Sequence, residues 1–182
     1  MLLSAHSSAL LLVDLQDRLL PTVLEQDELI ERCRLMLHAA RRLDVPVLVT
    51  EQYPKGLGPT VAAVAELLRP DEVIAKIAFS AMGDPHVVER IGMLGRETLV
   101  VAGAESHVCV LQTVLDLIGR GRKVAVVADA VGSRRAFDKE TALVRMRRAG
   151  AQVVTADMVV FEWLERAGTD DFKALVPLLR GR

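Results

Sequence analysis

The chain has 182 residues, 51% of them apolar, which is enough to build a large buried core. Its 23 Lys and Arg residues balance 24 Asp and Glu, and aromatic residues make up only 3%. A net charge of −1 and so few aromatic side chains exclude a strongly basic nucleic-acid-binding surface and a platform for stacking bases.

The organisation of the chain predicts one domain over residues 1–182, because no Pro/Gly/Ser-rich or highly charged stretch divides it. The N-terminus lacks a signal-peptide pattern, and no apolar run is long enough to cross a membrane. We therefore expect a cytoplasmic protein that binds neither membranes nor nucleic acid. The two cysteines are not expected to form a disulfide in that compartment.

Six short apolar runs, taken in chain order, predict strands. Unbroken apolar runs of this length are typical of strands that are covered on both faces, as in a parallel sheet. The runs are 8–13 (SALLLV), 45–50 (VPVLVT), 72–75 (EVIA), 97–102 (ETLVVA), 123–128 (KVAVVA) and 152–155 (QVVT).

Amphipathic segments alternate with these runs and predict helices at 27–43, 60–68, 85–94, 107–118, 138–149, 157–166 and 170–180. The alternation indicates an α/β fold with right-handed crossovers. We expect a three-layer α-β-α arrangement around a doubly wound six-stranded parallel sheet of order 3-2-1-4-5-6. Ligands of such sheets bind beyond the carboxyl ends of the strands, here between the first and fourth strands.

Three reactive side chains are predicted to lie at that edge. Asp14 follows the first strand, Lys76 follows the strand at 72–75, and Cys109 opens the helix after the fourth strand. A thiol in the first turn of a helix is favoured as the thiolate, and a neighbouring cation would lower its pKa further. From position alone, a capping acid, a surface lysine and a small buried hydrophobe are the alternatives.

The segment Gly103-Ala104-Glu105-Ser106-His107-Val108-Cys109 makes the pattern specific. Here the chain resembles the isochorismatase-like family of cysteine hydrolases, and more closely its short, metal-free members of unassigned substrate. The motifs ALLLVDLQD, TEQYPKGLG, ESHVCVLQTVLDL and VVADAVGSR carry the resemblance from Ala9 to Phe172. The family pattern is an Asp after an apolar strand, a distant Lys, and Cys-Val after a Gly-rich turn.

The resemblance implies a catalytic triad of Asp14, Lys76 and Cys109. Cys109 would attack a carbonyl carbon, and Asp14 would take the thiol proton and later activate water or protonate the leaving group. Lys76 would hold the carboxylate and the thiolate in register. The resemblance also implies a cis peptide at Ala104-Glu105, with the backbone N–H groups of Cys109 and of Glu105 or its neighbour directed at a developing oxyanion.

Other residues near the strand ends are candidates for lining the substrate pocket, with loop packing as the alternative. They are Gln16, Gln52, Tyr53, Phe79 and Leu111. Nicotinamidases of this family hold a metal through histidines after the second strand, but this chain reads EQYPK at 51–55, so we expect no metal and no other cofactor. His107 is expected at the helix entry or the pocket edge. It is not expected to activate the Cys109 thiol, because side chains two residues apart on a helix project in different directions.

The predicted function is hydrolysis of an amide or related C–N bond in a small-molecule substrate, through a thioester on the cysteine. Two alternatives are open: a non-catalytic binding or scaffold protein of the same fold, and a vinyl-ether hydrolase of the isochorismatase type, whose reaction needs the acid but no thiol. Apolar helical faces at 108–118 and 159–164, with the family's habit of forming dimers or larger closed assemblies, predict a homo-oligomer.

Overall fold

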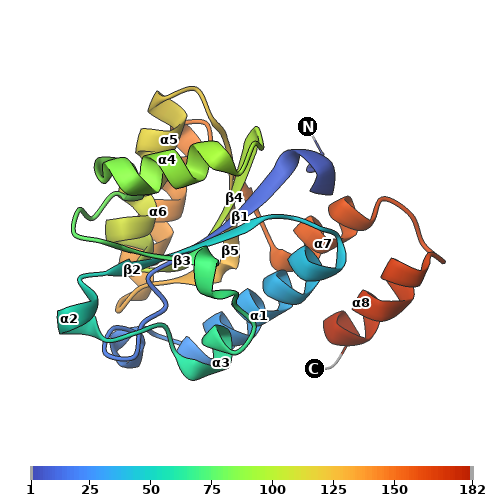
Figure 1. Cartoon of the computed structure of the whole chain (residues 1–182), viewed down its shortest axis with the longest axis horizontal. Helices are drawn as coiled ribbons and strands as arrows, with labels where there is room; N and C mark the ends of the chain where they lie inside the picture. The colour runs from blue at the N-terminus through green and yellow to red at the C-terminus, as the bar shows by residue number, and fades with distance from the viewer. Residues whose placement is uncertain (1, 181–182) are drawn as a thin grey trace.

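The computed structural model describes residues 2–180, in which six strands form one all-parallel sheet (Figure 1). The strands are β1 (Ser8–Val13), β2 (Val47–Gln52), β3 (Val73–Lys76), β4 (Thr98–Ala104), β5 (Lys123–Gly132) and β6 (Gln152–Val154). Their order is β3-β2-β1-β4-β5-β6, and each neighbouring pair is parallel. This confirms the doubly wound sheet predicted from the sequence.

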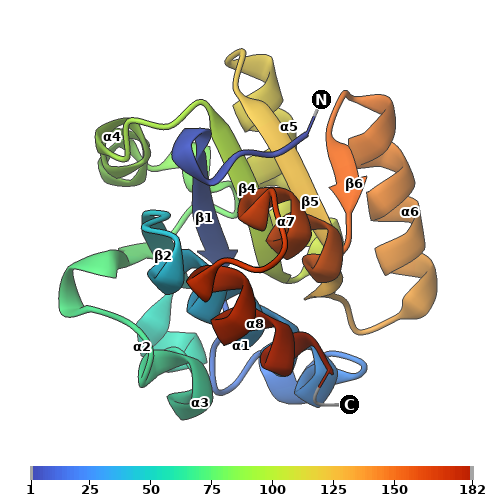
Figure 2. The ribbon, with the colours of Figure 1, turned by 90° about the vertical axis from the view of Figure 1, so that its right-hand side faces the viewer.

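Helices cover both faces of the sheet and complete the predicted three-layer arrangement. One face is covered by α1, α3, α7 and α8, and the other by α4, α5 and α6 (Figures 1 and 2). The helices are α1 (Gln26–Arg42), α2 (Pro54–Leu57), α3 (Ala62–Ala65), α4 (Pro85–Met93), α5 (Leu111–Gly119), α6 (Ala136–Arg148), α7 (Ala156–Leu164) and α8 (Asp170–Arg180).

Strand β1 lies in the middle of the sheet and is buried on both faces. Its side chains alternate, so that Leu10 and Leu12 belong to the apolar cluster beneath α1, whereas Leu11 belongs to the cluster beneath α4 and α5. Complete burial of a leucine side chain stabilises a fold by about 1.5–3 kcal/mol. A slip of one residue would exchange the two faces, so the apolar run fixes the register and the position of Asp14 after it.

Strands β1 and β4 approach closely at their carboxyl ends, where Val13 is paired with Gly103. Gly103 has φ of +117°, and a Cβ atom there would lie 2.1 Å from the carbonyl oxygen of Val13. Only glycine fits this position, because it has neither a side chain to clash nor a penalty at positive φ. This close approach brings the segment after β4 next to Asp14.

The strands end later than predicted at this edge. Parallel pairing carries β2 to Gln52, β3 to Lys76, β4 to Ala104 and β5 to Gly132, all beyond the apolar runs that predicted them. Lys76 is therefore the last residue of its strand and does not follow it. Backbone pairing, which the apolar pattern does not report, sets these boundaries.

Two predicted helices differ in form. The helix predicted at 60–68 is confined to α3, because Thr60 pairs with Gln16 in an isolated antiparallel bridge and so cannot begin a helix. The helix predicted at 107–118 begins as a π-helical turn, Ser106–Val110, before α5. Cys109 thus lies in a π turn, a form that is frequent at functional sites.

Candidate active site

Asp14 and Lys76 form a buried ion pair at the carboxyl edge of the sheet. The Lys76 Nζ atom lies 2.8 Å from Asp14 Oδ2, and both side chains are fully buried. The Thr50 hydroxyl, from the neighbouring β2, donates to Asp14 Oδ1 over 2.7 Å. The carboxylate is therefore held by one cation and one hydroxyl, which is what a buried charge requires.

The Lys76 ammonium group is surrounded by oxygen acceptors. Besides Asp14, it donates to the side-chain oxygen of Gln52 at 2.7 Å and approaches the carbonyl oxygens of Phe79 at 3.1 Å and Ala78 at 3.3 Å. An ammonium group has three N–H donors, so these four oxygens share them. Lys76 is built into the protein as a fixed positive charge.

Cys109 completes this group from the π turn after β4. Its thiol lies beside the ion pair, because the charges of Asp14 and Lys76 both act on its ionisation. Only 5% of Cys109 is exposed. Three residues that are widely separated in the sequence therefore converge on one buried point, as the order of the strands predicted.

The ionisation of Cys109 differs from the expectation. Burial and, to a smaller extent, the Asp14 carboxylate raise the pKa of its thiol to about 12, and Lys76 only partly opposes them. The expectation of a thiolate at a helix terminus was therefore wrong, because it took no account of desolvation or of the adjacent negative charge. At neutral pH the resting group is a neutral thiol beside the Asp14–Lys76 pair.

The pKa of Asp14 is also raised by burial, with the Lys76 charge and the Lys76 and Thr50 hydrogen bonds opposing the rise. A raised pKa makes the carboxylate a stronger base than an aspartate in water. The site thus places a base of increased strength beside a neutral thiol.

The turn that carries Cys109 begins at a cis peptide bond between Ala104 and Glu105. The Glu105 carbonyl oxygen accepts the backbone N–H groups of Val108 at 3.1 Å and Val110 at 3.2 Å. The turn therefore folds back on its first residue, and Cys109 lies between the two donors.

The predicted pocket-lining residues fall into two groups. Gln16 and Gln52 are buried, and their amides are used within the protein: Gln16 bonds both backbone groups of Gln52 and the carbonyl of Gly58, while Gln52 bonds Lys76 and the carbonyl of Ile77. Tyr53 and Phe79 are 52% and 55% exposed. Leu111 is buried in the apolar cluster that includes Cys109.

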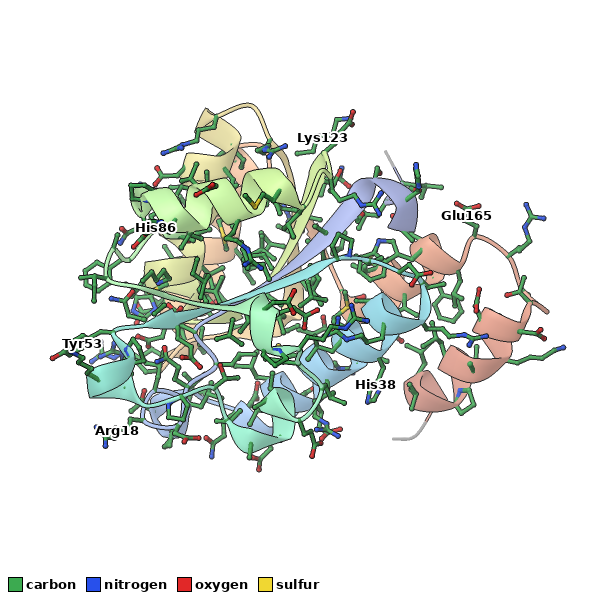
Figure 3. All side chains as sticks on the ribbon, in the orientation of Figure 1. Arg18, His38, Tyr53, His86, Lys123 and Glu165 are labelled. Atoms are coloured by element: carbon green, nitrogen blue, oxygen red, sulfur yellow. The ribbon has the colours of Figure 1, made fainter. Side chains whose placement is uncertain are left out.

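The two exposed rings belong to segments that contact Lys76. The Tyr53 backbone N–H donates to the carbonyl of Lys76 over 2.8 Å, and Phe79 belongs to the segment whose carbonyl meets the Lys76 ammonium group. Tyr53 projects beyond the carboxyl ends of the strands, and Lys123 marks the opposite edge of the sheet (Figure 3). The structure therefore brings Gln52, Tyr53 and Phe79 to Lys76, and Leu111 to the apolar side of Cys109.

Known proteins identify the family. The family model described as the Isochorismatase domain matches residues 8–158 of this chain. The chain belongs to the isochorismatase family. Isochorismatase domain-containing protein 2A from Mus musculus is 37% identical over 177 residues, which are 96% of this chain and 84% of that protein.

Solved structures of similar proteins agree with this fold. The structure of MAR1 ribonuclease from Caenorhabditis elegans has a TM-score of 0.91 and 36% identity, covering 98% of this chain and 92% of that one. The YcaC gene product of Escherichia coli, described as an octameric hydrolase of unknown specificity, has a TM-score of 0.93 and 27% identity, covering 100% and 92%. The family supports a hydrolase fold for this chain.

Three contacts of this isochorismatase-family site were not predicted. Thr50 bonds Asp14, Arg134 bonds Glu105, and Ser133 lies 3.0 Å from His107 through their side chains. A polar residue at the end of the apolar run 45–50 was the available signal for Thr50. The Ser-Arg pair that closes the VVADAVGSR motif was the available signal for the other two contacts.

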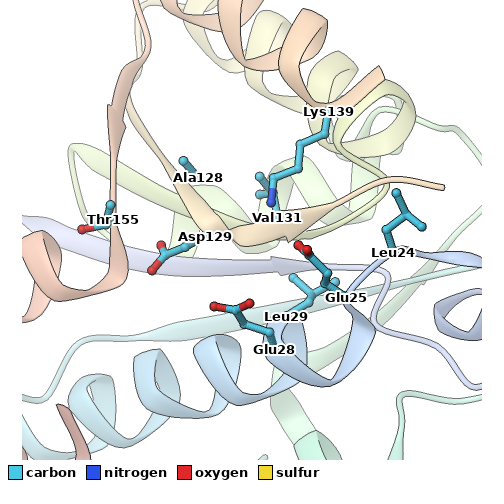
Figure 4. A pocket seen from close by; sticks show the side chains of 9 residues that line it. All are labelled: Leu24, Glu25, Glu28, Leu29, Ala128, Asp129, Val131, Lys139 and Thr155. Atoms are coloured by element: carbon cyan, nitrogen blue, oxygen red, sulfur yellow. The ribbon is translucent and has the colours of Figure 1, made fainter. Parts of the chain in front are cut away.

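A separate pocket of about 310 Å³ lies between the start of α1, the carboxyl half of β5 and α6 (Figure 4). Glu25, Glu28 and Asp129 face it, and Lys139 reaches into it from α6. None of the three reactive residues lines this pocket. Among residues 2–180, no group of three or more His, Cys, Asp and Glu residues is arranged to hold a metal, and no helix is long and apolar enough to cross a bilayer.

The ionisation of Cys109 predicts its reactivity toward iodoacetamide. With a thiol pKa of about 12, labelling is expected to be slow near pH 7 and to rise about tenfold for each pH unit between 7 and 10. Asp14→Asn removes the carboxylate that raises this pKa, so labelling at a given pH is expected to accelerate. Intact-mass spectrometry over time measures both rates.

The control is Cys33, which is fully buried and has its pKa raised by burial and by Asp129. A Cys33→Ser variant is expected to label as the unaltered protein does, since all modification should occur at Cys109. Rapid labelling at pH 7 that no longer rises with pH would show a thiolate in the resting state and contradict this account.

Proposed function

We propose that this isochorismatase-family protein hydrolyses an amide or related C–N bond of a small molecule through a thioester on Cys109. The observation that carries the proposal is the buried Asp14–Lys76 ion pair, whose two charges act on the neighbouring Cys109 thiol. A nucleophile in contact with its base, and a base held by a third group, is the arrangement that covalent catalysis requires.

The first half of the reaction transfers the acyl group. As sulfur attacks the carbonyl carbon, Asp14 takes the thiol proton and the carbonyl oxygen becomes an oxyanion. The backbone N–H groups of Glu105 and Cys109 are the proposed donors to this oxyanion. When the C–N bond breaks, Asp14 returns the proton to the leaving amine, so that a thioester and a free amine are formed.

The second half restores the enzyme. Asp14, now ionised again, takes a proton from a water molecule as the water oxygen attacks the carbonyl carbon of the thioester. The C–S bond breaks, the proton passes to sulfur, and the carboxylic acid leaves. Each cycle consumes one water molecule and needs no oxidant or reductant.

Lys76 serves this reaction as a positive charge and transfers no proton. Its N–H groups donate to Asp14, Gln52 and the carbonyls after β3, which hold the ammonium group beside the carboxylate. When negative charge develops on sulfur, the ammonium group stabilises it, since Lys76 lowers the pKa of Cys109. Asp14 raises the pKa of the Cys109 thiol and Lys76 lowers it, and this balance suits a thiol that ionises only during attack.

The thiol favours C–N cleavage over the two alternatives. Vinyl-ether hydrolysis uses the acid alone and leaves no role for a thiol beside Asp14. A scaffold protein gains nothing from a buried ion pair that requires desolvation of two charges. The proposal takes residues 1–182 as a single isochorismatase-like hydrolase domain.

The test is a substrate panel measured by product release. Purified protein is incubated separately with primary amides, N-carbamoyl amino acids, a vinyl ether and RNA. RNA is included because the similar C. elegans structure is named as that of a ribonuclease. We expect amine or ammonia release from at least one C–N substrate, abolished by Asp14→Asn. Turnover of the vinyl ether alone, with the panel's C–N bonds intact, would overturn the proposal.

We further propose a homo-oligomer in the cytoplasm. The similar YcaC structure is octameric, and α7 leaves Met158 and Phe161 about half exposed on this chain. Exposed apolar side chains grouped on one helix are typical of subunit contacts. Both cysteines are free, which suits a reducing compartment.

A further inference from the structure

The segment between β5 and α6 holds the turn that carries Cys109. Arg134 donates from Nε to Glu105 Oε1 at 2.9 Å and from Nη2 to Oε2 at 2.7 Å, so the pair is bidentate. Next to it, Ser133 is joined to His107 through its hydroxyl at 3.0 Å. Two consecutive residues of one loop therefore brace two residues of the nucleophile turn.

The two partners of the ion pair differ in exposure. The Glu105 side chain is 6% exposed, whereas that of Arg134 is 56% exposed. Glu105 thus turns its carboxylate inward beneath the Arg134 guanidinium group, and the Arg134 backbone N–H and the nearby His107 also act on this carboxylate. A planar fork of two parallel N–H donors fixes both the position and the rotation of a carboxylate.

The backbone of Glu105 connects this clamp to the chemistry. Its carbonyl oxygen accepts the N–H groups of Val108 and Val110, the residues on either side of Cys109. If the Glu105 residue rotated, both acceptor bonds and the direction of its own N–H group would change together. The side chain is the only part of Glu105 that reaches another element through a described hydrogen bond.

We propose that Arg134 is a positioning residue for the reaction: by clamping the Glu105 carboxylate it fixes the nucleophile turn and the backbone N–H groups that receive the oxyanion. This inference rests on the proposed hydrolytic function and adds to it a residue that touches neither the thiol nor its base. Arg134 acts through Glu105 alone.

The pH dependence of the clamp has a defined sign. The pKa of Glu105 is lowered mainly by the Arg134 hydrogen bond, with burial opposing it, so the clamp forms fully above the ordinary glutamate pKa and is lost as the pH falls through the lowered value. Without Arg134, the pKa of Glu105 rises. The Glu105 carboxyl group should then become protonated at a higher pH, whereas the acid limb of the rate profile follows Asp14, whose pKa is raised.

The test compares Arg134→Gln and Arg134→Lys with the matched control Arg135→Gln, which alters the next arginine in the chain. Loss of an oxyanion donor costs about 100- to 1,000-fold, so misplacement of one should reduce kcat about 10- to 100-fold with little change in KM. Arg134→Lys, with a point charge in place of a fork, is expected to fall between, and added guanidinium ion should partly rescue Arg134→Gln.

Hydrogen–deuterium exchange of the peptide that spans 105–110 supplies a second readout that does not depend on turnover. Arg134→Gln is expected to speed exchange of the Val108 and Val110 amides, and Arg135→Gln is not. If the unaltered protein turns over no substrate, the proposed function fails, and exchange alone decides whether the clamp exists. Unchanged exchange in Arg134→Gln, or unchanged kcat in an active enzyme, would overturn the inference.

Discussion

Replacing Cys109 with alanine is expected to reduce hydrolysis of a C–N substrate by at least about a thousandfold, since loss of a nucleophile removes the covalent route entirely. The fold should survive, because alanine fits the buried position and removes only one weakly polar atom. Asp14 and Lys76 would still neutralise each other through their direct contact. Steady-state rates measured alongside thermal unfolding separate loss of chemistry from loss of structure.

The matched control for this change is Cys33→Ala, which removes the other buried thiol on the α1 side of the sheet. That variant should retain its kcat and lose some stability, because a fully buried side chain is shortened. Cys109→Ala with near-normal turnover would show that the reaction uses the acid alone and would return the vinyl-ether alternative to the front.

Replacing Lys76 with methionine is expected to destabilise the protein by about 3–5 kcal/mol, because removing one partner of a buried ion pair leaves the other charge uncompensated. Methionine is similar in length to lysine, so little of the loss should come from an empty space. The Gln52 side-chain oxygen and the Phe79 carbonyl would also lose their donor. Denaturant unfolding at fixed pH measures the change.

The loss should depend on pH in a direction that the contacts specify. Lys76 opposes the rise in the pKa of Asp14, so the variant should raise that pKa further above its ordinary value of 3.8. A carboxyl group whose pKa is raised by folding stabilises the folded state only at low pH and costs stability as the pH rises through the folded pKa. The deficit of Lys76→Met should therefore be smaller at pH 5 than at pH 8.

The double variant Asp14→Asn with Lys76→Met provides the check on this explanation. Removing both charges should cost less stability than the sum of the two single changes, because the double variant leaves no unpaired buried charge. Strict additivity of the two losses would mean that Asp14 and Lys76 do not interact in the folded protein.

The sequence was sufficient for the sheet and for the convergence of the three reactive residues. Apolar runs fix each strand, and the right-handed crossover rule leaves few orders for six parallel strands. Asp14 and Cys109 come after two strands that this order makes neighbours, so their meeting follows from topology. No detail of side-chain packing was needed to bring them together.

The roles of Gln16 and Gln52 could not be predicted in the same way. An amide at the end of a strand reads identically whether it faces a substrate or ties two loops together. The difference lies in which carbonyls come within reach, and that depends on the path of the loop that leads to Gly58. Because the amides of Gln16 and Gln52 are hydrogen-bonded within the protein, they are better interpreted as groups that hold Lys76 and its loop in place.

The ionisation of Cys109 and the role of Arg134 could be seen only in the three-dimensional structure, for different reasons. Rules about helix termini and nearby cations describe charges, but burial and the Asp14 carboxylate dominate the pKa of this thiol. Arg134 meets Glu105 because Ala104 pairs with Gly132, a register formed beyond the predicted ends of both strands. The predicted strands stopped too early to bring these two residues together.

The most direct test of the account is to look for the thioester itself. The protein is mixed with an activated acyl donor, quenched in acid within seconds, and its intact mass and peptide masses are measured. We expect one added acyl group on Cys109, removed by hydroxylamine and missing in Cys109→Ala. Turnover of the same donor with no adduct at Cys109, or an equal adduct in Cys109→Ala, would contradict a covalent role for this residue.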